Sequence, residues 1–301
     1  MSLSLLQRLG PRCKTVNQVN SLLIALENRM TPAETAQIVE TFRGDAMSLP
    51  FADGFAKSIA KNIEIMEAQL ATAKKARAET FQRFRIAKNL MLFSNKDINK
   101  SDKKLLICFT GRAGRMNMAL APFLQHFDSH TVDVAVVVIP SRDLKIGYRR
   151  GFCNFGPDVF TSVDRLAHAL SIHAYKSAST FGTSAGAIVA ILATLQLRLE
   201  KAIACTPTHP NDPFWEEIYN KSLEEELIAL QAYNEVSEII TIYHPLFGPD
   251  VLSADALAKI IKLRAVTVNM PKSFKGNPHM VLGYAMIYGV LDQILNATLY
   301  K

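Results

Sequence analysis

The stretch SASTFGTSAGAIVAILATLQLRL, residues 177–199, decides the fold. Its first five residues are typical of a short strand, and the apolar run from Ala185 onward is typical of a buried helix. Between them lies Gly182-Thr183-Ser184-Ala185-Gly186, a G-x-S-x-G pattern. We therefore predict a strand, a sharp turn and a helix, with Ser184 at the turn.

The two glycines of this pattern have a physical reason. A serine at such a turn adopts a strained backbone conformation and projects its hydroxyl above the sheet. The strand and the helix approach so closely that side chains at positions 182 and 186 would collide, and Gly182 and Gly186 avoid the collision. The helix N-terminus directs N–H groups toward Ser184, which favours a developing oxyanion there. The pattern predicts a nucleophile; an ordinary glycine-rich turn or a phosphate cradle stays open as the alternative.

After Lys104 the chain alternates between short apolar runs and helical patterns. The runs at 105–109 and 132–139 are typical of strands buried on both faces of a parallel sheet. Further strands are expected at 177–181, 202–205, 239–243 and 265–268. Helices are expected at 163–173, 185–199, 216–233, 254–263 and 280–299. This alternation predicts an α/β fold, with a mostly parallel sheet and helices on both faces.

The chain before residue 95 has a helical pattern instead. Thr15 followed by Gln18 is a capping-box signal, and Thr31 with Pro32 and Glu34 is a second helix start. That second helix is expected to end at Gly44, and a third, longer helix is expected over 53–92, since its apolar residues recur at three- and four-residue spacing. The polar residues 94–104 are typical of a linker. We therefore expect an all-helical N-terminal region over 1–100 and an α/β domain over 104–301.

The α/β half of the chain resembles the α/β-hydrolase superfamily, on the strength of the G-x-S-x-G turn and its flanking elements. In that family a loop after an early strand supplies part of the oxyanion hole. Here the segment Phe109-Thr110-Gly111-Arg112-Ala113-Gly114 takes that position, without the His-Gly-Gly form common in lipases and esterases. The resemblance implies that Ala185 and either Arg112 or Ala113 donate the oxyanion N–H groups, and that Gly111 lies at the substrate.

The family order of nucleophile, acid and histidine also implies the other two catalytic residues. Asp250 follows the strand expected at 239–243, and His279 follows the strand expected at 265–268. The resemblance therefore implies that His279 is the general base and that Asp250 orients it. Four rivals stay open: His244 and His209 as bases, and Asp255 and Asp212 as acids.

Two features depart from the family. Helices are expected where the family usually has extra antiparallel strands, and these helices have three open roles: covering the active site, docking a partner or mediating homo-oligomerisation. The connection over 207–235 is too short for a large lid. Within it, Phe214 and Trp215 are candidates for lining a substrate pocket, with simple core packing as the equal alternative.

Composition limits the other classes. The chain of 301 residues is 49% hydrophobic and 20% charged, with a net charge of +7. The four cysteines lack metal-ligand spacing, and the sequence has no dinucleotide fingerprint, so we expect neither a metal nor a cofactor. The start of the chain has no signal-peptide pattern, and the apolar run at 185–195 is too short to span a bilayer. We therefore expect a cytoplasmic protein.

The implied function is a serine hydrolase that cleaves a carboxylic ester or thioester through an acyl-enzyme on Ser184. Its substrate would be a small-molecule, glycan or lipid acyl compound. Acyl transfer with the same residues is the near alternative, and a non-catalytic protein that binds through its N-terminal helices is the second class. Nucleic-acid binding rests only on the modest positive charge and ranks last.

Overall fold

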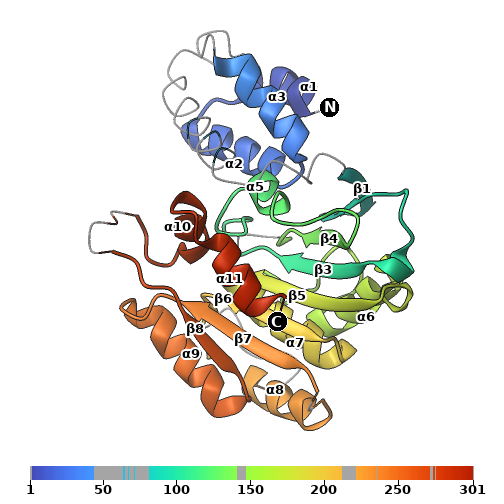
Figure 1. The fold of residues 1–301 in the computed structure, drawn as a ribbon, viewed down its shortest axis with the longest axis vertical. Helices are drawn as coiled ribbons and strands as arrows, with labels where there is room; N and C mark the ends of the chain where they lie inside the picture. The colour runs from blue at the N-terminus through green and yellow to red at the C-terminus, as the bar shows by residue number, and fades with distance from the viewer. Residues whose placement is uncertain are drawn as a thin grey trace.

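The computed structural model describes residues 2–43, 64, 67, 71, 81–140, 147–211, 222–234, 236–271, 274 and 276–300. Its centre is an eight-stranded sheet with the order β1-β2-β4-β3-β5-β6-β7-β8 (Figure 1). The strands are β1 (Gln82–Ala87), β2 (Leu90–Ser94), β3 (Lys104–Phe109), β4 (Val132–Val137), β5 (Ser177–Thr183), β6 (Lys201–Cys205), β7 (Glu238–Tyr243) and β8 (Arg264–Thr267). β1 and β2 pair antiparallel, and β3 to β8 run parallel. The predicted fold class is confirmed.

Helices cover both faces of this sheet. They are α5 (Leu120–Leu124), α6 (Val159–Leu170), α7 (Ala185–Leu197), α8 (Leu223–Ala232), α9 (Gly248–Ile260), α10 (Val281–Ile287) and α11 (Leu291–Thr298). Alternate residues of β3 point to opposite faces, as strand geometry requires. Leu105 and Ile107 join the core under α6 to α9, whereas Leu106 and Cys108 join the core under α5, α10 and α11. One apolar core therefore packs against each face of the sheet.

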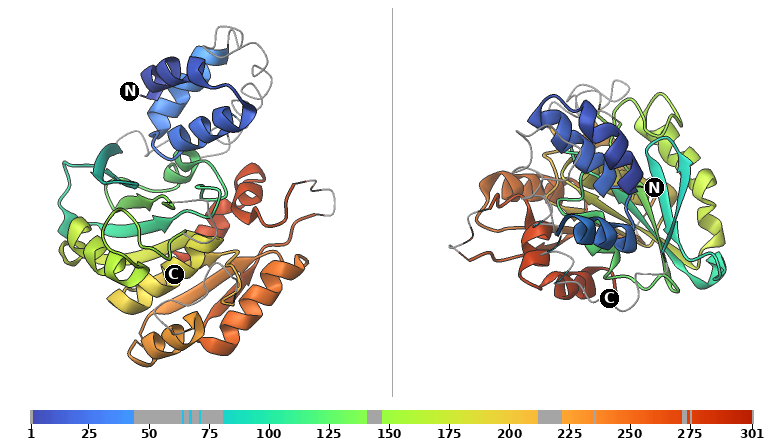
Figure 2. Two further views of the ribbon diagram at one scale, coloured as in Figure 1. Left: turned by 180° about the vertical axis from the view of Figure 1, so that it is seen from behind. Right: turned by 90° about the horizontal axis from the view of Figure 1, so that it is seen from above.

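The N-terminal helices are α1 (Ser2–Leu9), α2 (Val16–Glu27) and α3 (Pro32–Arg43). Figure 2 shows them as a group at one end of the molecule, beyond the layers of the sheet. The two predicted helix starts are confirmed, because Thr15 Oγ1 accepts from Gln18 N and Thr31 Oγ1 accepts from Glu34 N, each at 3.2 Å. Glu34 Oε2 accepts in return from Thr31 N, which completes a capping box.

The predicted helix over 53–92 is wrong in its last part, because residues 82–94 form a hairpin. Asn89 takes the left-handed conformation at the turn, with φ of 61°, and Phe93 pairs with Arg83. The hairpin joins the sheet through pairing of β2 with β4, so the predicted boundary at Lys104 lies inside the sheet. The expected helix end at Gly44 lies outside the described residues, as does almost all of 53–80.

Three other expectations need correction. The predicted helix over 280–299 is two helices, because Gly289 between them has φ of +69°. α9 begins at Gly248, six residues earlier than expected, so Asp250 lies in the first turn of a helix and not in a loop. α1 and α5 are absent from the predicted elements, since both are too short to give a strong periodic signal.

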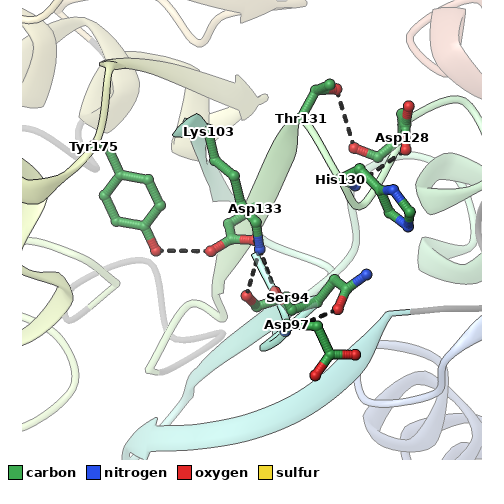
Figure 3. Close-up of polar contacts among 9 residues, drawn as sticks. Ser94, Asp97, Lys103, Asp128, His130, Thr131, Asp133 and Tyr175 are labelled. Carbon is green, nitrogen blue, oxygen red and sulfur yellow. Dashed lines mark hydrogen bonds and ion pairs between the residues drawn. The ribbon is translucent and has the colours of Figure 1, made fainter. Parts of the chain in front are cut away.

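A buried charge cluster fixes the sheet at the amino-terminal ends of β3 and β4 (Figure 3). The Lys103 ammonium is fully buried, and its Nζ lies 2.9 Å from Asp133 Oδ1 and 3.2 Å from Ser94 Oγ. The Tyr175 hydroxyl donates to Asp133 Oδ2 at 2.9 Å. Burial is tolerable for these charges because each has an ionic or hydrogen-bonding partner. The segment 94–104, which was expected to be a polar linker, therefore contains a core residue, Lys103.

Candidate active site

Ser184 occupies the turn between β5 and α7, with φ of 53° and ψ of −122°. This conformation is costly for a residue with a side chain. A Cβ on Gly182 would collide with the carbonyl oxygen of Gly186, and a Cβ on Gly186 would collide with that of Phe109. The predicted strand, sharp turn and helix are thus confirmed, and both glycines are required for the reason given above.

The backbone of Ser184 is fixed to the neighbouring strand. Its N–H donates to the carbonyl oxygen of Cys205, the last residue of β6, at 2.9 Å. Ser184 is half-buried, and Ala185 beside it is fully buried. Ala185 is the first residue of α7, so its N–H is one of those that a helix leaves without an intrahelical acceptor. Ala185 therefore suits the predicted role of oxyanion donor.

The structure brings Asp250 and His279 together. His279 Nδ1 lies 2.8 Å from Asp250 Oδ1, across 29 residues of sequence. The Asp250 side chain is 4% exposed and that of His279 is 27% exposed. The carboxylate is therefore buried, whereas the imidazole that it contacts is more accessible. Asp250 also lies in the first turn of α9, where the helix dipole favours a negative charge. Its second oxygen, Oδ2, is buried and has no hydrogen-bond partner within the described parts of the chain.

Ser184 and His279 share no hydrogen bond in the described structure, but Asn117 connects their surroundings. The Asn117 amide donates to Thr206 Oγ1 and to the backbone oxygen of His279, each at 3.3 Å. Thr206 directly follows Cys205, the residue that accepts from Ser184 N. The His279 turn is therefore held beside the carboxyl end of β6, the strand next to the Ser184 turn.

Asn117 is a residue that the sequence did not single out. It has φ of 59°, and Thr206 has φ of 47°, so both join Ser184 in the left-handed half of backbone space. Such conformations gather at functional sites because the surrounding contacts must hold them. An asparagine in a loop is common, and only the fold places Asn117 against Thr206 and the His279 turn.

The predicted oxyanion loop lies directly against Ser184. A Cβ on Gly111 would stand 3.0 Å from the Thr183 carbonyl oxygen and 3.1 Å from Ser184 Cβ. Gly111 N donates to Arg115 O at 2.9 Å, and Gly114 N donates to Gly111 O at 2.8 Å. These two N–H groups are thus engaged within the loop, which keeps Arg112 and Ala113 as the candidate donors.

The rival residues have other surroundings. His244 is buried, and its Nδ1 lies 3.0 Å from the Val268 carbonyl oxygen. His209 Nδ1 accepts from Asn211 N at 3.1 Å, and Asp255 is exposed on α9. Neither histidine has a carboxylate partner in the contacts of the described residues, unlike His279. Three further candidates, Asp212, Phe214 and Trp215, lie outside the described residues.

Cys205 lies next to the site but is a poor nucleophile. Burial raises the pKa of its thiol far above the ordinary value, and the nearby Asp250 carboxylate raises that pKa further. The thiolate is the reactive form of cysteine, so a protonated Cys205 stays inert at neutral pH. Ser184 therefore stays the candidate nucleophile at this end of the sheet.

The described residues lack both a metal centre and a membrane-spanning helix. No group of three or more histidine, cysteine, aspartate or glutamate side chains there has the arrangement of a metal centre. No helix in the same parts of the chain has both the length and the apolar character needed to cross a membrane.

Comparison with known proteins finds similarity in solved structures. No protein-family model matches the chain, and no curated protein sequence matches it significantly. An esterase from Pyrobaculum calidifontis has a TM-score of 0.47 at 9% identity, over 80% of this chain and 91% of that one. A predicted hydrolase from Thermoplasma acidophilum has a TM-score of 0.45 at 16% identity, over 72% and 97%. A thermostable carboxylesterase cloned from a metagenomic library has a TM-score of 0.43 at 12% identity, over 80% and 93%.

Proposed function

We propose that this protein is a serine hydrolase that cleaves a carboxylic ester or thioester through an acyl-enzyme on Ser184. The observation that carries the proposal is the hydrogen bond between His279 and the buried Asp250. Both residues follow the carboxyl ends of parallel strands, as Ser184 does. A histidine with a buried carboxylate on Nδ1 is held in the tautomer whose Nε2 accepts a proton. The strained turn at Ser184 supports the same role.

In the first half of the proposed reaction, Ser184 Oγ attacks the acyl carbon while His279 Nε2 takes the hydroxyl proton. The carbonyl oxygen becomes an oxyanion, which the N–H groups of Ala185 and of Arg112 or Ala113 stabilise. His279 then returns its proton to the leaving alcohol or thiol as the carbon–oxygen or carbon–sulfur bond breaks. Asp250 stabilises the imidazolium that exists between these two proton transfers.

In the second half, water attacks the acyl-enzyme and gives its proton to His279. The tetrahedral intermediate collapses, the acid departs, and the proton on His279 returns to Ser184 Oγ. An alcohol or amine that replaces water in this step gives acyl transfer instead. The two outcomes use the same residues and differ only in which acceptor reaches the acyl-enzyme.

Hydrolysis of p-nitrophenyl esters of short and medium acyl chains tests the proposal. We expect turnover by the wild-type protein and its loss in both Ser184→Ala and His279→Ala. The matched control is His209→Ala, which removes a histidine of the rival set, and its turnover should equal that of the wild type. Adding an alcohol acceptor and measuring the ester product separates acyl transfer from hydrolysis. A wild type without turnover would favour the non-catalytic alternative.

A further inference from the structure

Arg115 links the nucleophile turn to the N-terminal helices. Its backbone oxygen accepts from Gly111 N at 2.9 Å and from Thr183 Oγ1 at 3.1 Å, so it fixes the oxyanion loop to the end of β5. Its guanidinium pairs with α2, because Arg115 Nη2 lies 2.8 Å from Glu27 Oε2. One residue therefore contacts both the strand that precedes Ser184 and the last residue of α2.

Two adjacent residues at the end of α2, both buried, contact the loop. The Glu27 side chain is 7% exposed, against 28% for Arg115. The next residue, Asn28, is 2% exposed, and its amide donates to the Gly114 carbonyl oxygen. Gly114 has φ of +71°, a conformation that suits glycine, and the space beside it faces Ile24 of α2. The loop that carries the candidate oxyanion donors is thus attached to the last residue of α2, Glu27, and to the C-cap residue Asn28.

The opposite end of the same loop is attached to the base. Asn117 donates to the backbone oxygen of His279, and Asn117 O lies where a Cβ on Gly283 would approach within 2.9 Å. The loop from Gly111 to Asn117 is therefore held by the end of α2 at Gly114 and Arg115, and by the His279 turn at Asn117. Its position relative to Ser184 depends on both attachments.

We propose that Glu27, acting through Arg115, is a positioning residue that holds the oxyanion loop at Ser184, so that the N-terminal helices are part of the working active site. This inference rests on the proposed hydrolase function. An oxyanion hole acts only when its donors stand at the position that the oxyanion will occupy, and a displacement of about 1 Å costs about 100-fold in rate. The ground-state substrate depends less on those donors, so the effect falls on kcat and leaves KM almost unchanged.

The test compares Glu27→Gln and Arg115→Met, each of which removes one partner of the ion pair, with the double variant. We expect kcat for p-nitrophenyl butyrate to fall about 10- to 100-fold in each single variant, with KM within about twofold. The kcat of the double variant should be no lower than that of the less active single variant, because both changes remove the same contact. The affinity for a trifluoromethyl ketone, which forms an oxyanion on the enzyme, should fall in parallel with kcat/KM.

Arg83→Met is the matched control. Arg83 NH1 pairs with Glu34 Oε2 at 2.8 Å, so it also joins the N-terminal helices to the sheet, but through β1 and not through the loop. Its kcat should stay within about twofold of the wild-type value, and thermal unfolding shows that each variant is folded.

An active wild type together with folded Glu27→Gln and Arg115→Met variants of unchanged kcat would overturn the positioning role alone. The positioning role would also be overturned if Arg83→Met lost as much activity as Glu27→Gln and Arg115→Met. A wild type that neither hydrolyses esters nor reacts with a fluorophosphonate would instead overturn the proposed function, and the positioning role with it.

Discussion

His279 Nδ1 and Asp250 Oδ1 lie 2.8 Å apart, although the two residues are 29 positions apart in the sequence. Asp250 comes from the first turn of α9, and His279 comes from the turn that precedes α10. Because Asp250 is almost fully buried, its charge acts on the imidazole with little screening by solvent.

Asp250→Asn should therefore abolish most of the activity without unfolding the protein. Asparagine keeps the shape but cannot hold the imidazole in the required tautomer, so we expect kcat to fall by about 10³- to 10⁴-fold. The measurement is steady-state ester hydrolysis together with circular dichroism. Asp255→Asn is the control on the same helix, because Asp255 is exposed there. Equal activity of the two variants would show that Asp250 has no catalytic role.

Replacing Ser184 should separate chemistry from backbone strain. Ser184→Gly and Ser184→Ala both remove the proposed nucleophile, but only glycine tolerates φ of 53° and ψ of −122° without cost. We expect Ser184→Gly to raise the free energy of unfolding by about 1 kcal/mol, with Ser184→Ala close to the wild type. Urea denaturation measures both. Ser171→Gly, at another left-handed serine, should gain stability and keep its activity.

The Lys103 cluster should govern stability and not activity. Lys103→Met leaves the buried Asp133 charge without its ionic partner, which costs about 3–5 kcal/mol. Lys104→Met is the control, because Lys104 is the next residue and is exposed. Denaturant titration should show the loss for Lys103 alone, while kcat of the folded protein stays unchanged. A Lys103→Met variant as stable as Lys104→Met would contradict this account.

The pH dependence of stability should expose the cost of burying Glu27. Burial raises the pKa of Glu27 above its ordinary value of 4.5, and the ion pair with Arg115 only partly opposes that rise. The folded protein then binds more protons at this site than the unfolded chain, so stability falls as pH rises through the interval between the two pKa values. The advantage of wild type over Glu27→Gln in free energy of unfolding should therefore be largest below pH 4.5 and shrink above it.

This dependence also distinguishes positioning from simple stabilisation. If Glu27 only stabilised the fold, the stability and the kcat of Glu27→Gln would change together. We expect the two quantities to change differently at neutral pH. There the variant no longer has to bury a charge, which limits its loss of stability, whereas its kcat still falls. Chemical denaturation and ester hydrolysis in the same buffers measure the two quantities. A wild-type advantage that grows with rising pH would contradict the raised pKa.

The sharp turn at Ser184 was predictable because its signal is local. Gly182, Ser184 and Gly186 lie within five residues, and their spacing indicates that the strand and the helix approach closely. The parallel strands were predictable for a similar reason, since apolar runs such as 105–109 are buried on both faces. The pairing of His279 with Asp250 was implied by their order after late strands, through the family resemblance.

The rest depends on contacts that are distant in sequence. The hairpin at 82–94 was missed because the helical spacing, which ends at residue 70, was extended into it, and its pairing with β4 is distant in sequence. Glu27 is a charged residue at a helix end, which usually indicates an exposed position, and only the fold places it against Arg115. Asn117 likewise acquires its contacts from Thr206 and His279, which lie 89 and 162 residues away.

The most direct test of the central claim is covalent labelling of the wild-type protein with a fluorophosphonate, followed by mass spectrometry of its peptides. An activated serine attacks the phosphorus and displaces fluoride, which leaves a stable phosphonyl adduct. We predict one adduct per chain, on the peptide that contains Ser184, and none in Ser184→Ala or after mutation of His279 to alanine. An unlabelled wild type, or label that persists in Ser184→Ala, would contradict the assignment of Ser184 as the nucleophile.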